Sequence, residues 1–318
     1  GWTVNLTSHA YAAISDANFF GSDFVESLDT FLLFNKPGTN IFYCSPSNYT
    51  NGASGTDLVI AANNAVTSAS HSFGPLDAGQ TINITSGTGF LVGFYTIISV
   101  NLGAATLNNS PGVVGSTGGV WTEGAVFDPL YFAAKVGYPD NLAGIAVQNR
   151  LIWLIGAQST GEIWFDAGAA DFPFQIMGGP FIEHGAMAAF SIAKQGGSVF
   201  WLSQDAQGTS IVVEGAQLTS TKISTPAIEA AIGSYSVISD AVGFCYEQLG
   251  HAFYWLKFPS ANNGLGTDWV YDMSTKQWAE RSWLNPATCE AEGHRAFCAA
   301  FAYGVNIVGD RQNGQLYM

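Results

Sequence analysis

The stretch GTDWVYDMSTKQW, from Gly266 to Trp278, reads as a turn, a short aromatic strand and a second turn. Five other segments of the chain follow the same outline: GWTVNLTSHAY at the front, then GTNIFYCS, TGEIWFDAG, GTSIVVEG and NGQLYM. A strand that recurs in this way indicates one structural unit repeated along the chain, and repeats should be sought before any other motif.

The repeat has a regular period. The central apolar residues of the last four strands are 48, 58 and 47 positions apart, and these are Ile163, Ile211, Trp269 and Leu316. The step from Ile41 to Ile163 is 122, but it falls to 48 when residues 50–123, which read differently, are set aside. A period of roughly 20–50 residues is typical of arrays and propellers.

Each repeat contains four short strands. Two apolar runs around a tight turn precede the aromatic strand, as in GIAVQNRLIWLIG and GFCYEQLGHAFYWLKF, and a fourth run such as FPFQIM or KQWAERSW follows it. This pattern predicts a hairpin followed by two further antiparallel strands. The sequence therefore predicts an all-β fold, a β-propeller of repeated four-stranded blades with a small inserted β domain. A β-sandwich explains the recurring unit less well.

The repeat also sets the expected domains. We expect residues 1–49 and 124–318 to form the propeller and residues 50–123 to form an inserted small β module. The inserted stretch has three charged residues, Asp57, Asp77 and Glu123. It is either a contact module or a stabilising flap, since loops tolerate insertions at little cost.

The chain begins in a run that matches the third strand of a blade. Residues 2–6 therefore either join the last blade or belong with blades outside this chain. One helix is expected at STPAIEAAIG, with Thr225 as N-cap, Pro226 at the first position and Gly233 as its end. Its apolar face should pack on a blade.

The chain is acidic and has few charged residues. Lys and Arg number 10 against 24 Asp and Glu, a net charge of −14, and charged residues make up 11% of the chain. A surface that grips nucleic acid needs clustered basic residues, so the composition argues against one. It is compatible with a passage along which DNA slides. The longest apolar run, FLVGFYTIISV, is too short to cross a bilayer.

A search for catalytic and metal-binding motifs predicts no catalytic, cofactor-binding or metal-binding residue. Three histidines lie in similar contexts and could converge with Glu247 in a metal or acid–base site, namely His184, His251 and His294. Motif-free histidines more often satisfy backbone groups, and the histidines are interpreted in that way. The four cysteines, Cys44, Cys245, Cys289 and Cys298, form no recognisable disulfide or zinc pattern.

Carboxylates recur near the ends of the third strands, at Asp166, Glu214, Asp272 and Asp310. A glycosidase needs two carboxylates about 5–10 Å apart in one cleft. Their equivalent positions in successive repeats instead predict that they cap the turn into the last strand.

A long stretch resembles a known family. It runs from FDPLYFAAKVGYPDNLAGIAVQNRLIWLIG through GPFIEHGAMAAFSIAKQGGSVFWLSQDAQG to WVYDMSTKQWAERSW and VGDRQNGQLYM. These segments resemble the packaged-DNA stabilisation proteins of short-tailed bacteriophages, the tail hub or nozzle component. The resemblance covers residues 1–49 and 124–318, and the insertion departs from it.

The resemblance implies a non-enzymatic structural protein of the virion that is assembled in the host cytoplasm. It implies a homo-oligomeric, hexameric ring below the portal and adaptor proteins, which retains packaged DNA until ejection. It further implies contacts with a tail fibre or tailspike and with a tail needle or plug, and DNA that passes through the lumen without sequence-specific binding. No cofactor is implied.

A second hypothesis is a carbohydrate-binding or polysaccharide-degrading propeller of a phage tail. It would use tryptophans of the repeated strands with nearby carboxylates, namely Trp164, Trp201 and Trp255. These residues lie in the middle of strands, where tryptophan usually packs into the core.

Overall fold

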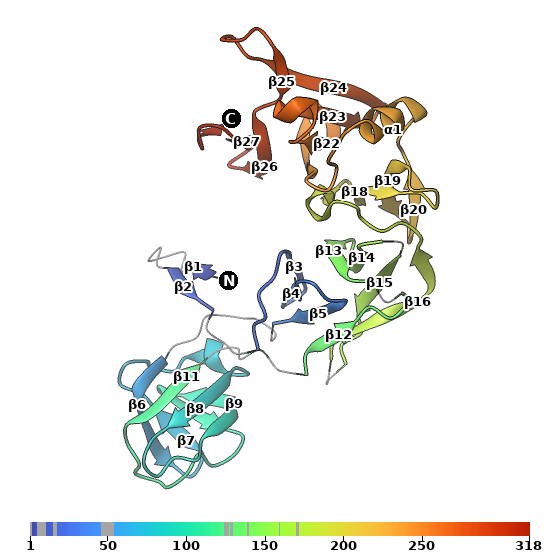
Figure 1. Cartoon of the computed structure of the whole chain (residues 1–318). Coiled ribbons are helices and arrows are strands. Elements are labelled where there is room, and N and C mark those ends of the chain that lie inside the picture. The colour runs from blue at the N-terminus through green and yellow to red at the C-terminus, as the bar shows by residue number, and fades with distance from the viewer. Residues whose placement is uncertain are drawn as a thin grey trace. The chain divides into compact units, whose positions relative to one another are not determined.

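The computed structural model describes residues 2–4, 11–14, 18–45, 54–123, 127, 130–138, 140–158, 160–169 and 172–318. The chain divides into two compact units, which are described one at a time. The first contains residues 1–20, 29–32 and 44–131, and the second contains residues 21–28, 33–43 and 132–318. Figure 1 shows the strands of both units, with labels where there is room.

Five antiparallel sheets follow the repeats of the sequence and are called blades 1 to 5. Blade 1 has the order β12 (Phe132–Ala134), β5 (Ile41–Cys44), β4 (Phe31–Asn35) and β3 (Val25–Leu28). Blade 2 runs β13 (Leu142–Gln148), β14 (Leu151–Gly156), β15 (Gly161–Asp166) and β16 (Phe174–Ile182). Blade 3 runs β17 (Ala193–Gln195), β18 (Ser198–Gln204), β19 (Ser210–Ala216) and β20 (Thr219–Lys222).

The last two sheets vary the pattern. Blade 4 has five strands, β21 (Val242–Gln248), β22 (His251–Phe258), β23 (Thr267–Asp272), β24 (Gln277–Leu284) and β25 (Ala291–Gly293). Blade 5 has three, β26 (Ala296–Ala302), β27 (Val305–Asp310) and β28 (Leu316–Tyr317). The predicted all-β class and repeated four-stranded unit are confirmed in blades 1 to 3, and blade 4 carries one strand more.

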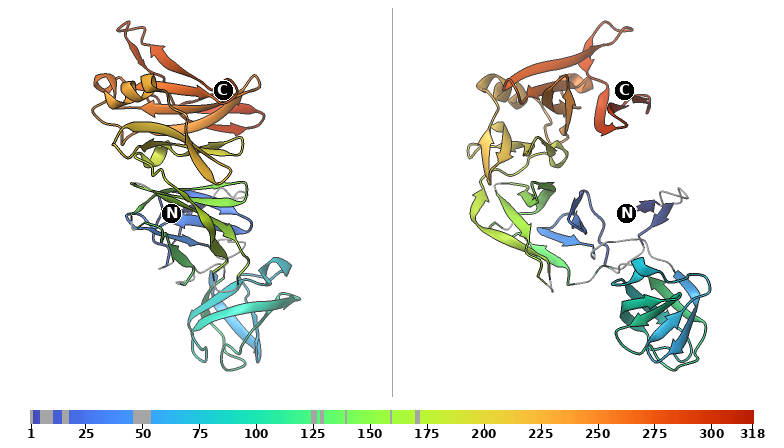
Figure 2. Two further views of the ribbon diagram at one scale, coloured as in Figure 1. Left: turned by 90° about the vertical axis from the view of Figure 1, so that its right-hand side faces the viewer. Right: turned by 180° about the vertical axis from the view of Figure 1, so that it is seen from behind.

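The blades lie side by side along their first strands. Strand β3 contacts β13, β13 contacts β17, β17 contacts β21, and β21 contacts β26. The same succession of sheets is visible within the second unit from the front and from behind (Figures 1 and 2). A four-stranded sheet with two apolar faces requires a neighbour on each side, which explains the stacking.

Tight turns join the first two strands of each blade. In blade 2 the turn residues Asn149 and Arg150 have φ of 52° and 62°, and in blade 4 Leu249 and Gly250 have φ of 52° and 82°. Two successive positive φ values suit the two-residue hairpin turn whose twist matches that of the strands. The predicted hairpins of all five repeats are present.

Large apolar side chains fill the spaces between neighbouring blades. Trp153 of blade 2 and Trp201 of blade 3 share one buried cluster. Phe200 of blade 3 stacks on Tyr254 of blade 4, with ring centroids 5.2 Å apart. Another cluster joins blade 4 to blade 5 through Trp255 and Ala296. The bulky strand residues therefore join the blades.

The predicted helix is α1 (Pro226–Gly233). Thr225 caps it by accepting a hydrogen bond from the Ile228 amide, as its sequence predicts. Ile228 and Ile232 are buried in the cluster that joins blades 3 and 4. The expectation that the helix packs on a blade is confirmed. Short 3₁₀ turns occur at η2 (Ala189–Ser191) and η3 (Asn262–Gly264).

The first unit contains a closed six-stranded barrel in the order β10-β7-β6-β11-β8-β9. Its strands are β6 (Ser54–Ala62), β7 (Ala65–Thr67), β8 (Thr81–Ser86), β9 (Gly93–Asn101), β10 (Ala104–Leu107) and β11 (Gly119–Glu123), with a 3₁₀ turn, η1 (Pro75–Asp77). Trp121 is fully buried at its centre, and its indole N–H donates to Asp57 at 3.3 Å. All six strands lie within residues 50–123.

A separate hairpin lies at the front of the chain. Strand β1 (Trp2–Val4) pairs antiparallel with β2 (Tyr11–Ala13). The predicted strand therefore exists over its first three residues, while positions 5 and 6 lie outside the described residues. Its predicted equivalence to the third strand of a blade, and the boundaries 1–49, 50–123 and 124–318, stay predictions.

Candidate functional site

The three histidines considered as a site each have their own structural partner. His184 Nδ1 lies 2.7 Å from the Ser220 hydroxyl, and burial lowers the pKa of His184. His251 starts β22 and lies 2.8 Å from an Asp272 oxygen. His294 Nδ1 accepts a hydrogen bond from the Ala296 amide at 3.1 Å. The Glu247 carboxylate accepts a hydrogen bond from the side-chain amide of Gln195 instead.

Metal binding requires several ligands close together. Within the described ranges, no group of three or more His, Cys, Asp or Glu side chains is placed to hold a metal ion. All four cysteines are free thiols, and burial raises the pKa of Cys245. The absence of catalytic, cofactor and metal residues stays a prediction.

Three of the four recurring carboxylates cap turns. Asp166 accepts from the Gly168 amide at 2.8 Å, Asp272 from the Ser274 amide at 2.8 Å and Asp310 from the Gln312 amide at 2.7 Å. Glu214 differs from the prediction because it lies inside β19 and accepts from the Ser198 hydroxyl at 2.6 Å. It faces a neighbouring strand, so the turn after it forms without its help.

The tryptophans proposed for sugar binding are buried. Trp201 is 0% exposed, and Trp164 and Trp255 are each 7% exposed. Their indole N–H groups donate inside the protein, to the Gly185 carbonyl at 3.2 Å, to Glu162 at 3.0 Å and to Asp268 at 3.1 Å, respectively. A sugar cannot stack on rings that are packed between blades, so these residues form no glycan platform.

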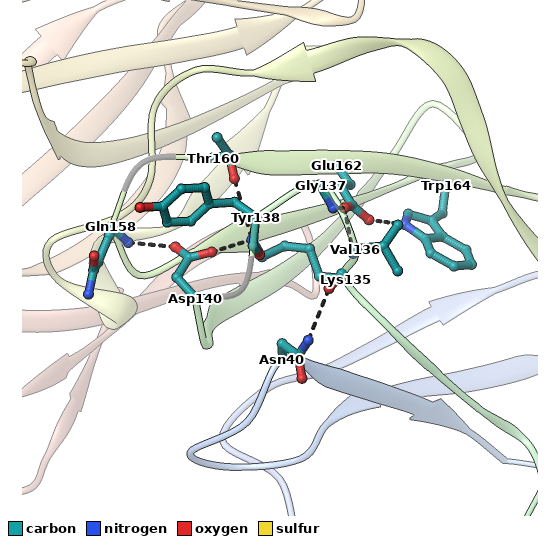
Figure 3. Close-up of polar contacts among 10 residues, drawn as sticks. All are labelled: Asn40, Lys135, Val136, Gly137, Tyr138, Asp140, Gln158, Thr160, Glu162 and Trp164. Atoms are coloured by element: carbon teal, nitrogen blue, oxygen red, sulfur yellow. Dashed lines mark hydrogen bonds and ion pairs between the residues drawn. The ribbon is translucent and has the colours of Figure 1, made fainter.

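A buried polar cluster lies instead where the chain passes from blade 1 to blade 2, and we call it the polar clasp (Figure 3). Its centre is the ion pair of Lys135 with Asp140, whose side chains are 0% and 2% exposed. Lys135 Nζ also donates to the Tyr138 carbonyl at 2.7 Å and to the Thr160 hydroxyl at 3.4 Å. All three ammonium protons therefore have acceptors.

The second half of the polar clasp is Glu162, which is 1% exposed on β15. It accepts hydrogen bonds from the amides of Val136, at 2.7 Å, and Gly137. Asn40, the residue directly before β5, donates to the Lys135 carbonyl at 3.0 Å. Both sheets thus hold the same connecting segment, and the polar clasp fixes how blade 2 follows blade 1.

A second buried ion pair occurs in blade 4. Lys257 and Asp268 are paired across β22 and β23, with side chains 1% and 2% exposed. Lys257 also donates to the His294 carbonyl at 2.7 Å, and Asp268 accepts from the His294 amide at 2.9 Å. Burial lowers the pKa of Lys257, and the neighbouring carboxylate offsets part of that effect. This pair ties blade 4 to the segment that leads into blade 5.

Glu162 of the polar clasp and Asp268 of the second ion pair occupy equivalent positions in the repeat. Glu162 and Asp268 each directly precede the central residue of a third strand, as Asn40 does in blade 1. In all three blades this polar residue holds a segment that connects two blades. Glu162 and Asp268 are buried and hydrogen-bonded, so they stabilise the fold rather than act as catalytic groups.

Sequence patterns did not single out Lys135, Asp140, Lys257 or Asp268 as site residues. A signal was present, because a lysine inside an apolar strand run such as FYWLKF is unusual in a chain with 10 basic residues. A charged residue inside such a run is rarely buried unless it is paired. The sequence pattern does not identify which carboxylate pairs with such a lysine.

A comparison with sequence models of protein families agrees with this architecture. The sequence model of the phage stabilisation family, described as bacteriophage P22 Gp10, β-propeller, matches residues 122–318. No curated protein matches the chain. One solved structure, a phage phi92 endosialidase, is 12% identical with a TM-score of 0.33, and the match covers 80% of this chain. The chain spans about 46% of that protein's length.

The matched family accounts for most of the chain, including blades 2 to 5. Its description confirms the propeller predicted from the repeats, and it confirms the resemblance noted in the sequence over residues 122–318. The extension of that resemblance to residues 1–49 stays a prediction. Across the described residues, no helix is long and apolar enough to cross a membrane. The chain belongs to the P22 Gp10-like family of phage DNA stabilisation proteins, which are virion proteins with a β-propeller.

Proposed function

We propose that this chain is a structural tail hub, or nozzle, that forms a homo-oligomeric ring below the portal and adaptor and retains packaged DNA until ejection. Membership of the DNA stabilisation family is the observation that carries the proposal. The ring is a hexamer, and the protein acts without catalysis. It holds a tail fibre or tailspike on its outside and a needle or plug below, and it is assembled in the host cytoplasm.

The charge distribution supports a conduit that does not bind DNA. The net charge is −14. Lys135 and Lys257 are buried in ion pairs, while Lys194, Lys222 and Arg295 pair with carboxylates. Half of the ten basic side chains are therefore committed within the protein. Since phosphate binding requires free basic groups, DNA would pass without being held.

The experiment that tests the proposal is electron microscopy of virions and of the purified chain, with nuclease digestion of virions as a second readout. Rings of six copies under one capsid vertex are expected. Virions assembled without this protein should leave their DNA open to nuclease, and virions that contain it should protect the DNA. Full protection without the protein, or its absence from the vertex, would contradict the proposal.

The barrel of the first unit is proposed to be a contact module. Several large apolar side chains near one another in its sequence are exposed, namely Leu91, Val92, Phe94, Val113 and Val114. The loops that carry them are paired, because Leu91 N donates to the Pro111 carbonyl at 2.7 Å and Val113 N to the Gly89 carbonyl at 2.8 Å. Exposed apolar patches of this kind mark protein contacts. The contact partner is proposed to be a tail fibre or a neighbouring subunit.

This contact is tested by replacing Leu91, Val92 and Val113 with serine and imaging the virions. Loss of fibres, or of order in the ring, is expected while the barrel stays folded. Replacing Ile98, which is exposed on β9, is the matched control. Virions with intact fibres and intact rings would show that the barrel is a stabilising flap.

A further inference from the structure

Blade 4 contains a cavity of about 660 Å³ that none of the groups described above uses. One wall follows the end of α1 and includes Tyr235 and Ser236, and another is the loop after β22 with Asn263. The floor is the cross-strand pair of Trp269 on β23 and Glu280 on β24. This volume lies within the range of small-molecule sites in proteins.

Two aromatic rings in the cavity are held in fixed positions. The Trp269 indole N–H donates to the Tyr235 hydroxyl at 2.9 Å. The Tyr235 ring packs against Phe258, with centroids 5.0 Å apart. Both rings are half-buried, so each is anchored in the core and still lines the cavity. A rigid aromatic surface costs little conformational entropy when a ligand binds.

Polar side chains around these rings have unused hydrogen-bonding capacity. The side chains of Asn263, Ser236 and Glu280 line the cavity and are exposed to solvent, and among the described residues none of the three has a hydrogen-bond or ion-pair partner. Asn263 has φ of 55° and follows Asn262 at 51°, a left-handed backbone that asparagine tolerates better than most residues. The loop thereby presents the side-chain amide of Asn263 to the cavity, which the Ser236 hydroxyl and the Glu280 carboxylate also line.

The charges of the cavity select the class of ligand. No lysine, arginine or histidine lines it, and Glu280 is its one carboxylate among the described lining residues. Anionic ligands would be repelled, and an apolar ligand would leave the polar groups unpaired. Hydroxyl groups can donate to Glu280 and exchange hydrogen bonds with Asn263 and Ser236, while the C–H face of a sugar ring can pack on the aromatic rings.

We propose that this cavity in blade 4 is a binding site for a neutral saccharide. It is distinct from the buried tryptophans Trp164, Trp201 and Trp255, and no covalent chemistry is involved. The inference does not depend on the tail-hub function, because it rests on the cavity alone.

Saturation-transfer NMR of the purified chain tests the site with three neutral probes, maltotriose, cellotriose and chitotriose, and with sialyllactose as the acidic comparison. Saturable binding of at least one neutral probe is expected, without binding of sialyllactose. Glu280→Gln and Asn263→Ala should each weaken that binding by about tenfold, which corresponds to about 1.4 kcal/mol, because each change removes a hydrogen-bonding group from the cavity.

Matched controls are the same changes at exposed residues outside the cavity, Glu290→Gln and Asn109→Ala, which should leave binding unchanged. Thermal unfolding of each variant checks that the fold is kept. No transfer to any neutral probe, binding that survives both cavity variants, or binding of sialyllactose alone would each overturn the proposal.

Discussion

Two lysines of this acidic protein are held in its interior with their charge. Removing an ammonium ion from water is costly, and the cost is recovered when a carboxylate and backbone carbonyls complete its hydrogen bonds. Lys257 meets that condition through Asp268 and the His294 carbonyl. Losing one partner of such a pair is far worse than losing both, because the other is left buried with its charge.

Lys257→Met should therefore destabilise the protein by about 3–5 kcal/mol, because the Asp268 carboxylate would stay buried without its cation. The double variant Lys257→Met with Asp268→Asn should recover most of that loss, since asparagine can still accept from Trp255 and the His294 amide. Urea unfolding followed by tryptophan fluorescence measures both. Lys276→Met, at an exposed lysine, is the control, and equal losses in the single and double variants would refute the argument.

Asp205 makes a pH-dependent contribution to the turn between β18 and β19. The Thr209 amide donates to it at 2.8 Å and lowers its pKa below 3.8; burial opposes this shift, and the Gln207 amide adds to it. Since the folded pKa lies below the unfolded one, the stabilisation is fully present above about pH 3.8 and is lost as the pH falls through the folded pKa.

Asp205→Asn removes this charge and keeps the shape. The difference in thermal midpoint between the parent and Asp205→Asn should be constant from pH 7 to pH 4.5 and should shrink only in more acidic solution. A difference that has already disappeared at pH 4.5 would mean that the turn does not favour the ionised carboxylate.

At the scale of elements, the hairpin turn largely decides how each blade begins. Glycines and asparagine at these turns indicated the hairpins in the sequence, and the positive φ values show why those residue types fit. Blade 4 departs from the rule, because Leu249 takes φ of 52° while its side chain is 95% exposed. The left-handed backbone at Leu249 costs free energy, and the exposed leucine side chain makes no packing contacts that would offset this cost.

Leu249→Asn should stabilise the protein by about 1 kcal/mol, because asparagine adopts this conformation at lower cost. Urea unfolding provides the measurement. Leu249→Lys keeps the unfavourable backbone while removing the exposed apolar group, so it should leave stability unchanged. If the lysine variant is stabilised as much as the asparagine variant, relief of backbone strain is not the cause.

At the scale of the whole molecule, the chain leaves blade 1 and returns to it at one place. The Cys44 amide donates to the Tyr131 carbonyl at 3.1 Å, and Tyr43 of β5 pairs with Phe132 of β12. The six barrel strands lie between these two points. An insertion whose ends meet can be removed with little effect on the sheet that carries it.

Deleting residues 50–123, with a short Gly–Ser link in their place, should leave the blades folded. The thermal midpoint of the remaining protein should change by only a few degrees, and its β-sheet circular dichroism should persist. This deletion tests the predicted boundaries 1–49, 50–123 and 124–318 directly. Aggregation of the shortened chain, compared with a control deletion of the exposed β24–β25 turn, would place the boundaries elsewhere.

Local features of the sequence predicted the strands, the hairpins and α1, because each depends on residues close together in the chain. Neither the polar clasp nor the buried ion pair of blade 4 was predictable in this way. Glu162 reaches Val136 across 26 positions, and Lys257 reaches His294 across 37. The cavity at Trp269 also depends on three segments, and its tryptophan looks in sequence like the buried ones. Such pairings are decided by how the sheets stack rather than by any local pattern.

The blades are joined by contacts of two chemical kinds, and cooling weakens both of them. Apolar contacts such as that of Phe200 with Tyr254 weaken on cooling, because the hydrophobic driving force decreases at lower temperature. The ion pair of Lys135 with Asp140 becomes more favourable on heating, because the free-energy cost of removing charged groups from water falls as the temperature rises. Chilling would therefore weaken the polar clasp and the apolar contacts together rather than open one blade boundary first.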